Sequence, residues 1–244
     1  MASAAHHRNR ILKQLSPAEH ERLASELEHV TLNFKEPLHE QGKRVGHVYF
    51  VNSGVVSLVT QLDEGQAVET GTVGREGMVG LSAFLGIPVS PARAFCQIPG
   101  DAFRLSVDAL RGHVAGGASL GPILLRYTSA VMAMLAQGAA CNRSHSVEER
   151  MCRWLLMTRD RVDSDEFPLT QEFLAQMLGV RRPTVSLAGT SLQRAGLIKY
   201  SRGRITILDR GGLEESSCEC YAMVQAQYDV ALGPDEEVTW NRGS

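Results

Sequence analysis

Residues 170–186 read TQEFLAQMLGVRRPTVS and predict two short helices joined by a tight turn. The Thr170 hydroxyl can accept a hydrogen bond from a backbone N–H of the first helical turn, as residues that begin helices commonly do. Gly179 can adopt the positive φ that a tight turn requires. Pro183 suits the start of a second helix, because the first turn of a helix leaves its backbone donors unpaired. The stretch therefore predicts a helix-turn-helix, a motif that places its second helix in the major groove of DNA.

The second helix is predicted to have a buried face and an outward face. Apolar or small side chains recur at steps of three or four, at Val185, Ala188, Leu192 and Ala195. The side chains left outward are of types that reach phosphates and base edges, namely Arg181, Arg182, Thr184, Ser186 and Gln193. Gly189 lies inside this helix, where it costs about 1 kcal/mol relative to alanine, and the pattern does not explain it.

A basic hairpin is expected after the second helix. Two short apolar runs that alternate, 197–200 and 205–208, flank Arg202 and Gly203 and predict the two strands of a wing. From Arg181 to Arg204 the chain has six basic residues and no acidic one, whereas the whole chain has a net charge of −2. We therefore expect a localised positive surface that binds double-stranded DNA.

The overall composition is that of a globular protein. The 244 residues, 43% hydrophobic and 21% charged, suffice for two domains. Without a long apolar run or a leader, we expect a cytoplasmic protein with no membrane partner. The five scattered cysteines imply no disulfide framework. Cys218 and Cys220 are expected to be inert and no metal site is expected, because no second pair has ligand spacing and the nearest histidine in sequence, His145, is over seventy residues away.

Residues 34–106 consist of short apolar or alternating runs broken by glycines such as Gly54. Closely spaced strands with glycine turns predict a small antiparallel β-roll of the cupin type. Ser16 and Glu19 form the capping box of a preceding helix, which we expect to continue to about Val30. The predicted fold class is α+β, with an N-terminal cupin-like antiparallel β-roll, a long dimerisation helix and a C-terminal winged helix-turn-helix.

The long helix, expected over 120–141, carries a heptad pattern and a second apolar face that includes Leu125 and Met132. We expect the second face to pack on the roll and the heptad face to pair with another copy of the chain. The alternative is that the heptad face packs on the chain's own roll. The expected dimer contacts are Leu120, Leu124, Tyr127, Val131, Met134 and Gly138.

A polar hinge, 142–145, is followed by a second capping box, Ser146 with Glu149, which opens a helix to about Arg161. The expected organisation has four parts. These are a β-roll sensor domain over 1–116, a dimerisation helix and hinge over 117–145, a winged helix-turn-helix over 146–212, and a C-terminal part over 213–244 with a helix over 213–230 and a polar tail.

This order of elements resembles the Crp-Fnr superfamily of bacterial transcription regulators over about residues 37–209. The roll segment 48–56, VYFVNSGVV, and the segment 170–186 carry the likeness. It implies a homodimer that reads a palindromic promoter site and contacts RNA polymerase, with the roll modulating domain orientation. It also implies that Arg182 reads guanine while Gln171 and Thr184 contact phosphates. The expected DNA contacts are Gln171, Arg181, Arg182, Thr184, Ser186, Leu187, Arg202 and Arg204.

Two regions depart from the family pattern. Pro183 stands where many members have a glutamate that reads cytosine, and Leu187 where some have an arginine. In the roll, Leu81 replaces the glutamate that grips the ribose of cyclic AMP and Ser90 replaces the arginine that pairs with its phosphate. We therefore expect no dependence on cyclic AMP, although Glu76 and Arg93 could substitute. The candidate effector pocket consists of Gly80, Leu81, Ser82, Ser90, Ala92, Arg93 and Leu135.

Several functional classes remain open. The effector could be a cyclic dinucleotide or an apolar molecule, or the roll could be a scaffold with a vestigial pocket in a ligand-independent regulator. Residues 1–40 contain no cysteine that could hold the iron-sulfur cluster of the oxygen-sensing branch. A haem ligand is not expected, since His39, His47 and His113 are interpreted as surface residues. A metal-dependent cupin-like enzyme is the alternative from another class, but no metal-binding spacing supports it, and we expect no enzyme.

Overall fold

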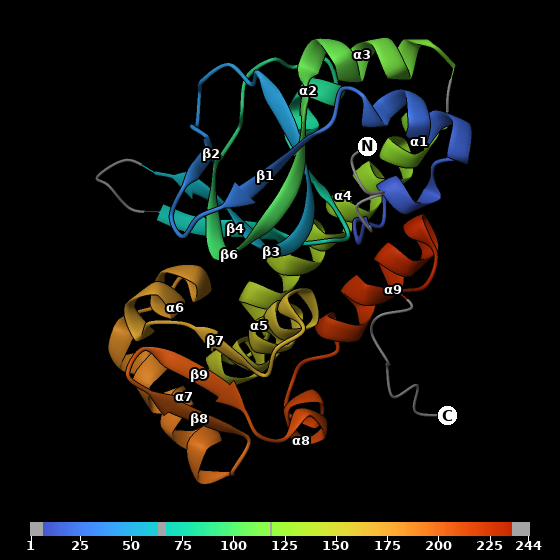
Figure 1. Cartoon of the computed structure of the whole chain (residues 1–244). Coiled ribbons are helices and arrows are strands. Elements are labelled where there is room, and N and C mark those ends of the chain that lie inside the picture. Colours follow the sequence, from blue (N-terminus) through green and yellow to red (C-terminus); the bar gives the residue numbers. More distant parts are fainter. Residues whose placement is uncertain (1–6, 63–66, 118, 236–244) are drawn as a thin grey trace.

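The computed structural model describes residues 7–62, 67–117 and 119–235. Figure 1 shows a sheet roll above, a winged helix-turn-helix below and a long helix, α4 (Leu120–Ser144), connecting them. The α+β class predicted from the sequence is confirmed. The predicted tail lies beyond Asp235 and thus outside the described residues.

The roll is built on two long antiparallel strands, β3 (His47–Gln61) and β6 (Arg93–Ser106), which pair along most of their length. The sheet order is β1-β6-β3-β4, with β2 added to β6 and β5 to β3. The other elements of the roll are η1 (Leu12–Gln14), α1 (Pro17–Ala24), β1 (Glu28–Leu32), β2 (Pro37–His39), β4 (Ala67–Val73), β5 (Met78–Val79), α2 (Leu81–Phe84) and α3 (Val107–Ala115).

One of the glycines that were expected to separate strands, Gly54, instead bends a strand. Gly54 lies inside β3 with a φ of 81°, at a point where the register of the β3–β6 pairing shifts. A Cβ atom at Gly54 would lie 2.5 Å from the carbonyl oxygen of Ile98 on the facing strand. The segment needs glycine because two backbones approach closely at a β-bulge, and the sequence pattern alone did not distinguish a bulge from a turn.

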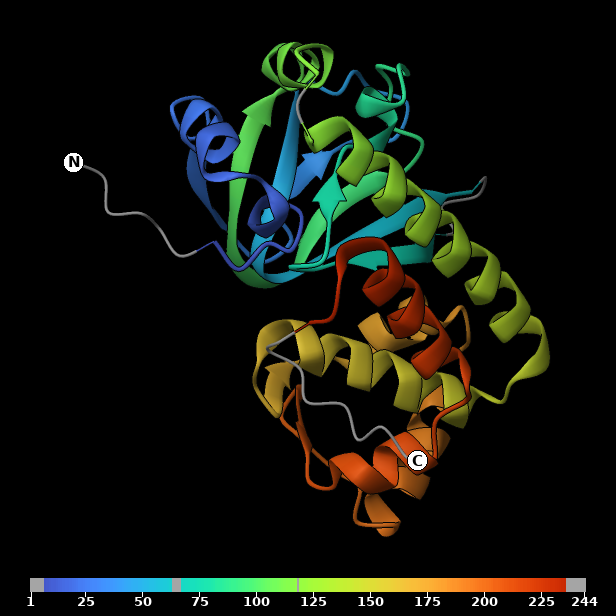
Figure 2. The same cartoon turned by 90° about the vertical axis from the view of Figure 1, so that its right-hand side faces the viewer.

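Two helix boundaries differ from expectation. The predicted capping box at Ser16 is present, but α1 ends at Ala24, and residues up to Leu32 form strand β1. The single C-terminal helix expected over 213–230 is two helices, α8 (Arg210–Glu215) and α9 (Cys220–Leu232). Figure 2 shows α9 packed beside α4.

Helix α4 turns its heptad face inward. Leu120, Leu124 and Tyr127 are at most 2% exposed within this single chain, so the expectation that they pair with another copy is wrong. The face that was expected to pack on the roll is partly in solvent, with Leu125 59% and Met132 66% exposed. The alternative interpretation of the heptad, packing on the chain's own roll, fits the structure. By length and composition α4 could also cross a membrane, a test that core helices of soluble proteins pass as well.

The C-terminal region begins with α5 (Val147–Val162), whose predicted capping box of Ser146 and Glu149 is present. Helices α6 (Gln171–Leu178) and α7 (Arg182–Arg194) follow, flanked by a small sheet in the order β7-β9-β8. Its strands are β7 (Glu166–Pro168), β8 (Ile198–Ser201) and β9 (Arg204–Ile207).

Gly189 is expected to be replaceable. It is buried inside α7, yet a Cβ atom there would meet only Met151, at an ordinary contact distance of 3.7 Å. Gly189→Ala should therefore raise the free energy of unfolding by about 0.5–1 kcal/mol, because alanine loses less conformational freedom in a helix.

Urea denaturation followed by circular dichroism would measure this change. Gly179→Ala is the matched control and should destabilise the protein, because Gly179 has a φ of 64°, which costs other residues about 1–2 kcal/mol. A loss of stability in Gly189→Ala similar to that in the control would contradict the prediction.

Candidate functional site

The helix-turn-helix has the local geometry that its sequence predicts. The Thr170 hydroxyl accepts a hydrogen bond from the Phe173 N–H at 3.1 Å and caps α6. Gly179 closes the helix in the left-handed conformation, and the Val180 N–H then donates to the Ala175 carbonyl at 3.0 Å. The turn thus positions α7 at a fixed angle to α6, with Val185 at its buried side.

The outward face of α7 is cationic at its N-terminus. Arg181, Arg182 and Thr184 are exposed, and within the part of the chain that the structure describes no carboxylate pairs with either arginine. Leu187 is 73% exposed, which is unusual for a leucine on a helix that packs elsewhere. Ala195 is exposed rather than buried, because α7 ends at Arg194.

Two of the residues predicted to contact DNA, Gln171 and Ser186, are hydrogen-bonded to each other. The Ser186 hydroxyl donates to the Gln171 side-chain oxygen at 2.8 Å, which links the start of α6 to α7. This bond leaves the amide N–H groups of Gln171 as donors for a further partner.

The wing turns through Arg202 and Gly203, which both have positive φ, as two-residue hairpins of the favoured type require. Arg202 is exposed at the tip. Arg204, which was also expected to contact DNA, pairs with Glu166 on the neighbouring strand β7. Its charge is therefore partly neutralised in this structure.

The roll contains an apolar pocket of about 440 Å³ between its sheet and α4. Of the candidate effector residues, the structure brings six to its wall, namely Gly80, Leu81, Ser82, Ser90, Ala92 and Leu135. Arg93 does not line this pocket and lies 3.6 Å from Glu40 in an ion pair. Among the described residues, no lysine, arginine, aspartate or glutamate lines it.

Two polar side chains of this pocket, those of Ser90 and His39, already have hydrogen-bond partners. The Ser90 hydroxyl donates to the Ala92 carbonyl at 2.6 Å. His39 is buried, not on the surface as expected, and its Nε2 bonds to the His47 carbonyl at 2.8 Å. Burial lowers the pKa of His39, so the ring is neutral at pH 7. The wall thus offers an anionic ligand no charged partner.

Helix α9 contributes to the pocket wall, which the sequence did not indicate. Tyr228 of α9 is 2% exposed, stacks on Tyr127 with ring centroids 6.3 Å apart and donates its hydroxyl to Met134 Sδ at 3.3 Å. Tyr127 and Tyr228 both line the cavity. Because Tyr228 is about a hundred residues from Tyr127 in sequence, periodicity within either helix could not reveal the contact.

A buried ion pair joins the roll to the C-terminal region. Arg161 of α5 lies 2.7 Å from Glu76 and donates to the Thr72 hydroxyl at 2.6 Å. Burial raises the pKa of Glu76, but the charge of Arg161, together with hydrogen bonds from Arg161 and from backbone N–H groups, outweighs it and holds that pKa below its ordinary value. Glu76, which was considered as a replacement for the missing effector-site acid, does not line the pocket and instead lies in the turn between β4 and β5.

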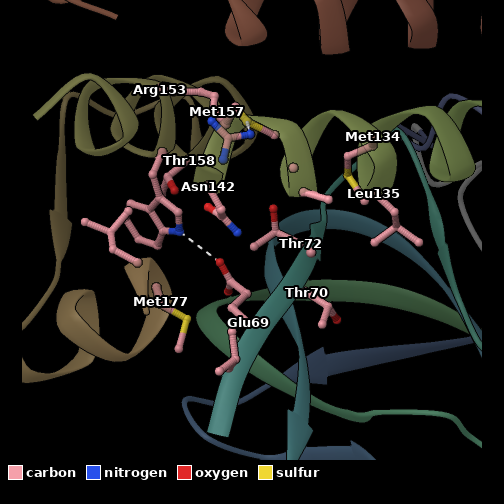
Figure 3. Close-up of a pocket in the computed structure, with 16 residues that line it drawn as sticks. Glu69, Thr70, Thr72, Met134, Leu135, Asn142, Arg153, Met157, Thr158 and Met177 are labelled. Carbon is pink, nitrogen blue, oxygen red and sulfur yellow. Dashed lines mark hydrogen bonds between the residues drawn. The ribbon is translucent and has the colours of Figure 1, made fainter. Parts of the chain in front are cut away.

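A second cavity, of about 260 Å³, lies at the same boundary between β4, α4, α5 and α6 (Figure 3). Its wall includes Glu69, which accepts hydrogen bonds from Trp154 Nε1 at 3.0 Å and from the Ser57 hydroxyl at 2.5 Å. Desolvation of its carboxyl group raises the pKa of Glu69 to about 7, against the effect of these hydrogen bonds.

The structure also gathers four side chains that the sequence analysis treated separately. Cys141 of α4 and His145, the C-cap residue of α4, lie beside Cys218 and Cys220 at the junction of α8 and α9. No metal site was expected for Cys218 and Cys220, because no second pair has ligand spacing in the sequence. The fold supplies that pair from a helix 77 residues earlier, as the Cys141–Cys218 contact shows.

Comparison with known proteins agrees with both halves of the fold. Residues 30–115 match the model of the cyclic nucleotide-binding domain, and residues 149–216 match that of the Crp-like helix-turn-helix domain. The transcriptional activatory protein AadR of Rhodopseudomonas palustris is 24% identical over 219 residues, which cover 82% of this chain and 85% of AadR.

Solved structures share the fold at low identity. FixK2 from Bradyrhizobium japonicum superposes with a TM-score of 0.67 at 18% identity, over 79% of this chain and 98% of FixK2. The c-di-GMP responsive global regulator CLP of Xanthomonas campestris superposes with a TM-score of 0.60 at 18% identity, over 80% of this chain and all of CLP (100%).

Glu69 predicts a pH dependence of stability. Its pKa is about 7 in the folded chain and near 4.5 when unfolded, so the folded state holds its proton to a higher pH. The contribution of Glu69 to stability is then full below pH 4.5 and is lost as pH rises through 7. Glu69→Gln keeps an acceptor for Trp154 and should remove this loss of stability at high pH. The free energy of unfolding of Glu69→Gln should therefore rise relative to that of the wild type as pH increases.

Urea denaturation at a series of pH values would measure the difference. Glu172→Gln, which alters an exposed acid on α6, is the matched control and should follow the wild-type curve. Identical pH profiles for wild type and Glu69→Gln would show that the carboxyl group titrates normally.

Proposed function

Because the chain belongs to the Crp-Fnr superfamily of transcription regulators, we propose that it acts as a homodimer that reads a palindromic promoter site in the cytoplasm and contacts RNA polymerase. The observation that carries this proposal is the exposed N-terminal end of α7, where Arg181 and Arg182 have no carboxylate partner among the described residues. An unpaired cationic helix end fits the major groove and its phosphates.

The reading roles follow from the chemistry of the side chains on this face. Arg182 can donate two parallel hydrogen bonds to O6 and N7 of guanine, and Thr184 can bond to phosphate. Gln171 is held by Ser186, which leaves its amide N–H groups for a phosphate oxygen. Leu187 is exposed and can contact the methyl group of thymine. Arg202, at the wing tip, supplies a further phosphate contact.

The dimer is proposed to form through the solvent face of α4. Pro122, Leu125, Ser129, Met132, Ala136 and Ala139 are exposed and recur at alternating steps of three and four, the pattern of a two-helix seam. These residues replace the inward heptad as the proposed interface. A seam of this kind also accounts for the apolar composition of α4 without a membrane.

Each part of the chain is proposed to have its own function. Residues 1–116 are proposed as the sensor domain, 117–145 as the dimerisation helix and hinge, 146–212 as the reading domain and 213–244 as a C-terminal part, of which Tyr228 lines the pocket. The pocket wall has no charged partner for a phosphate, so we propose an apolar effector and no dependence on cyclic AMP. The roll as a ligand-independent scaffold is the alternative. We propose no enzymatic activity.

Arg182→Ala should separate base reading from general affinity. Loss of a bidentate contact to guanine should weaken binding to the selected site by about 1–3 kcal/mol and relax preference at one base pair. Gln171→Ala, which removes a phosphate contact, should weaken binding to specific and random duplexes by similar amounts. Fluorescence anisotropy with a site selected from a random library would measure both.

Equal losses on specific and random duplex for Arg182→Ala would overturn the assignment of that residue. Failure of the wild-type protein to enrich any palindrome, with and without apolar extracts, would count against the proposed function itself.

Met132→Glu should yield monomers. A carboxylate at the centre of the proposed seam would face its own copy, and the cost of burying two like charges exceeds what a short seam supplies. Size-exclusion chromatography with light scattering would measure the mass. Ala115→Glu, on an exposed position of α3, is the control and should remain dimeric. A dimer that persists in Met132→Glu would place the interface elsewhere.

A further inference from the structure

Three thiols and one imidazole converge at the end of α4. Cys141 lies in the last turn of α4 and His145 is the C-cap residue just beyond it, while Cys218 and Cys220 flank a residue at the start of α9. Their ligand atoms all lie within 4.8 Å of one another. Cys141 Sγ is 3.6 Å from Cys218 Sγ, and Cys220 Sγ is 3.5 Å from His145 Nδ1.

The Cys141–Cys218 and Cys220–His145 distances match two edges of a tetrahedron around one metal ion. Zinc binds thiolate sulfur at about 2.3 Å and histidine nitrogen at about 2.0–2.1 Å, so the ligand atoms of a tetrahedral site are about 3.5–3.8 Å apart. Three cysteines and one histidine are a common ligand set of structural zinc sites. An iron-sulfur cluster distributes its cysteines over several iron atoms and needs a wider arrangement.

The groups around the four ligands also suit a cation. His145 turns its other ring nitrogen, Nε2, to the Glu219 carboxylate at 3.2 Å. This carboxylate–histidine arrangement orients the ring so that Nδ1 faces the thiols, as it does in established metal sites. Gln137 Nε2 donates to Cys220 Sγ at 3.0 Å, a bond that stabilises a thiolate.

The cluster is closed to solvent on the cysteine side. Cys141 and Cys220 are fully buried and Cys218 is 3% exposed, and the three form a cluster separate from the main core. Four protein ligands leave no open coordination position, which is the mark of a structural site.

We propose that Cys141, His145, Cys218 and Cys220 bind one zinc ion that fastens the α8–α9 junction to the end of α4. His145 is the C-cap residue that follows α4 and directly precedes Ser146, which caps α5. The ion therefore holds the C-terminal helix against the hinge that joins the roll to the reading domain. Binding requires the three thiols to release their protons to solvent, since the thiolate is the ligand.

A disulfide between Cys141 and Cys218 is the competing use of these residues. Their sulfur atoms are 3.6 Å apart, whereas a disulfide bond is about 2.05 Å long. Forming it would also remove two ligands, so the two outcomes are mutually exclusive and can be told apart.

The first experiment measures metal in the full-length protein purified under reducing conditions and then incubated with excess Zn²⁺ and desalted. Mass spectrometry of the metal content should give one zinc per chain. Replacement by Co²⁺ should give the intense visible bands of a tetrahedral thiolate site. Cys220→Ser should lose both signals, whereas Cys96→Ser, which alters a buried cysteine in the roll, should retain them.

Glu219→Gln tests the site without removing a ligand, and it keeps the proposal falsifiable if Cys220→Ser does not fold. Competition with a chromophoric chelator should show a loss of zinc affinity of about 10- to 100-fold. Glu215→Gln, an exposed acid on α8, is the control and should bind as the wild type does.

Several results would overturn the proposal. These are the absence of bound zinc after incubation, an equal loss of zinc in Cys96→Ser, an iron-sulfur chromophore, or a Cys141–Cys218 disulfide in protein isolated without reductant. None of these outcomes depends on DNA binding, so the zinc site and the proposed function can fail separately.

Discussion

The buried ion pair between Glu76 and Arg161 determines how the two halves of the chain sit against each other. Both side chains are removed from water, and a charge buried without its partner would cost several kcal/mol. The pair is therefore stable only while α5 stays against the roll. Gly74 is part of the same constraint, because a Cβ atom there would lie 2.5 Å from the Arg161 side chain. The orientation of α7 follows from that of α5, on which it packs.

The roll pocket lies close to this ion pair. Tyr127 lines the pocket and donates its hydroxyl to the Met78 carbonyl, two residues from Glu76. A Cβ atom at Gly77 would lie 2.3 Å from the same hydroxyl, so the Tyr127 ring packs directly against the loop that carries Glu76. The pocket and the ion pair are thus connected by direct packing through Tyr127.

Local features of the fold could be predicted from the sequence, and long-range ones could not. The caps at Thr170 and Ser146 and the turn at Gly179 depend on neighbouring residues, and all three are present. The two faces of α4 were assigned the wrong way round because both are apolar and periodicity does not say which face meets the roll. Gly54 was interpreted as a turn because its need for glycine comes from Ile98, on a strand more than forty residues away. The four-residue cluster at Cys141 was missed for the same reason.

Helix α9 is the element that connects these features. It supplies Tyr228 to the pocket, and its first residue, Cys220, belongs to the cluster beside the hinge. Near its other end, Asp229 accepts a hydrogen bond from Arg10 at 3.0 Å, which ties it to the N-terminal segment of the roll. A helix held at both ends cannot move away from Tyr127 without breaking one of these attachments. Helix α9 is therefore a fixed part of the pocket wall, held between the cluster beside the hinge and the N-terminal segment of the roll.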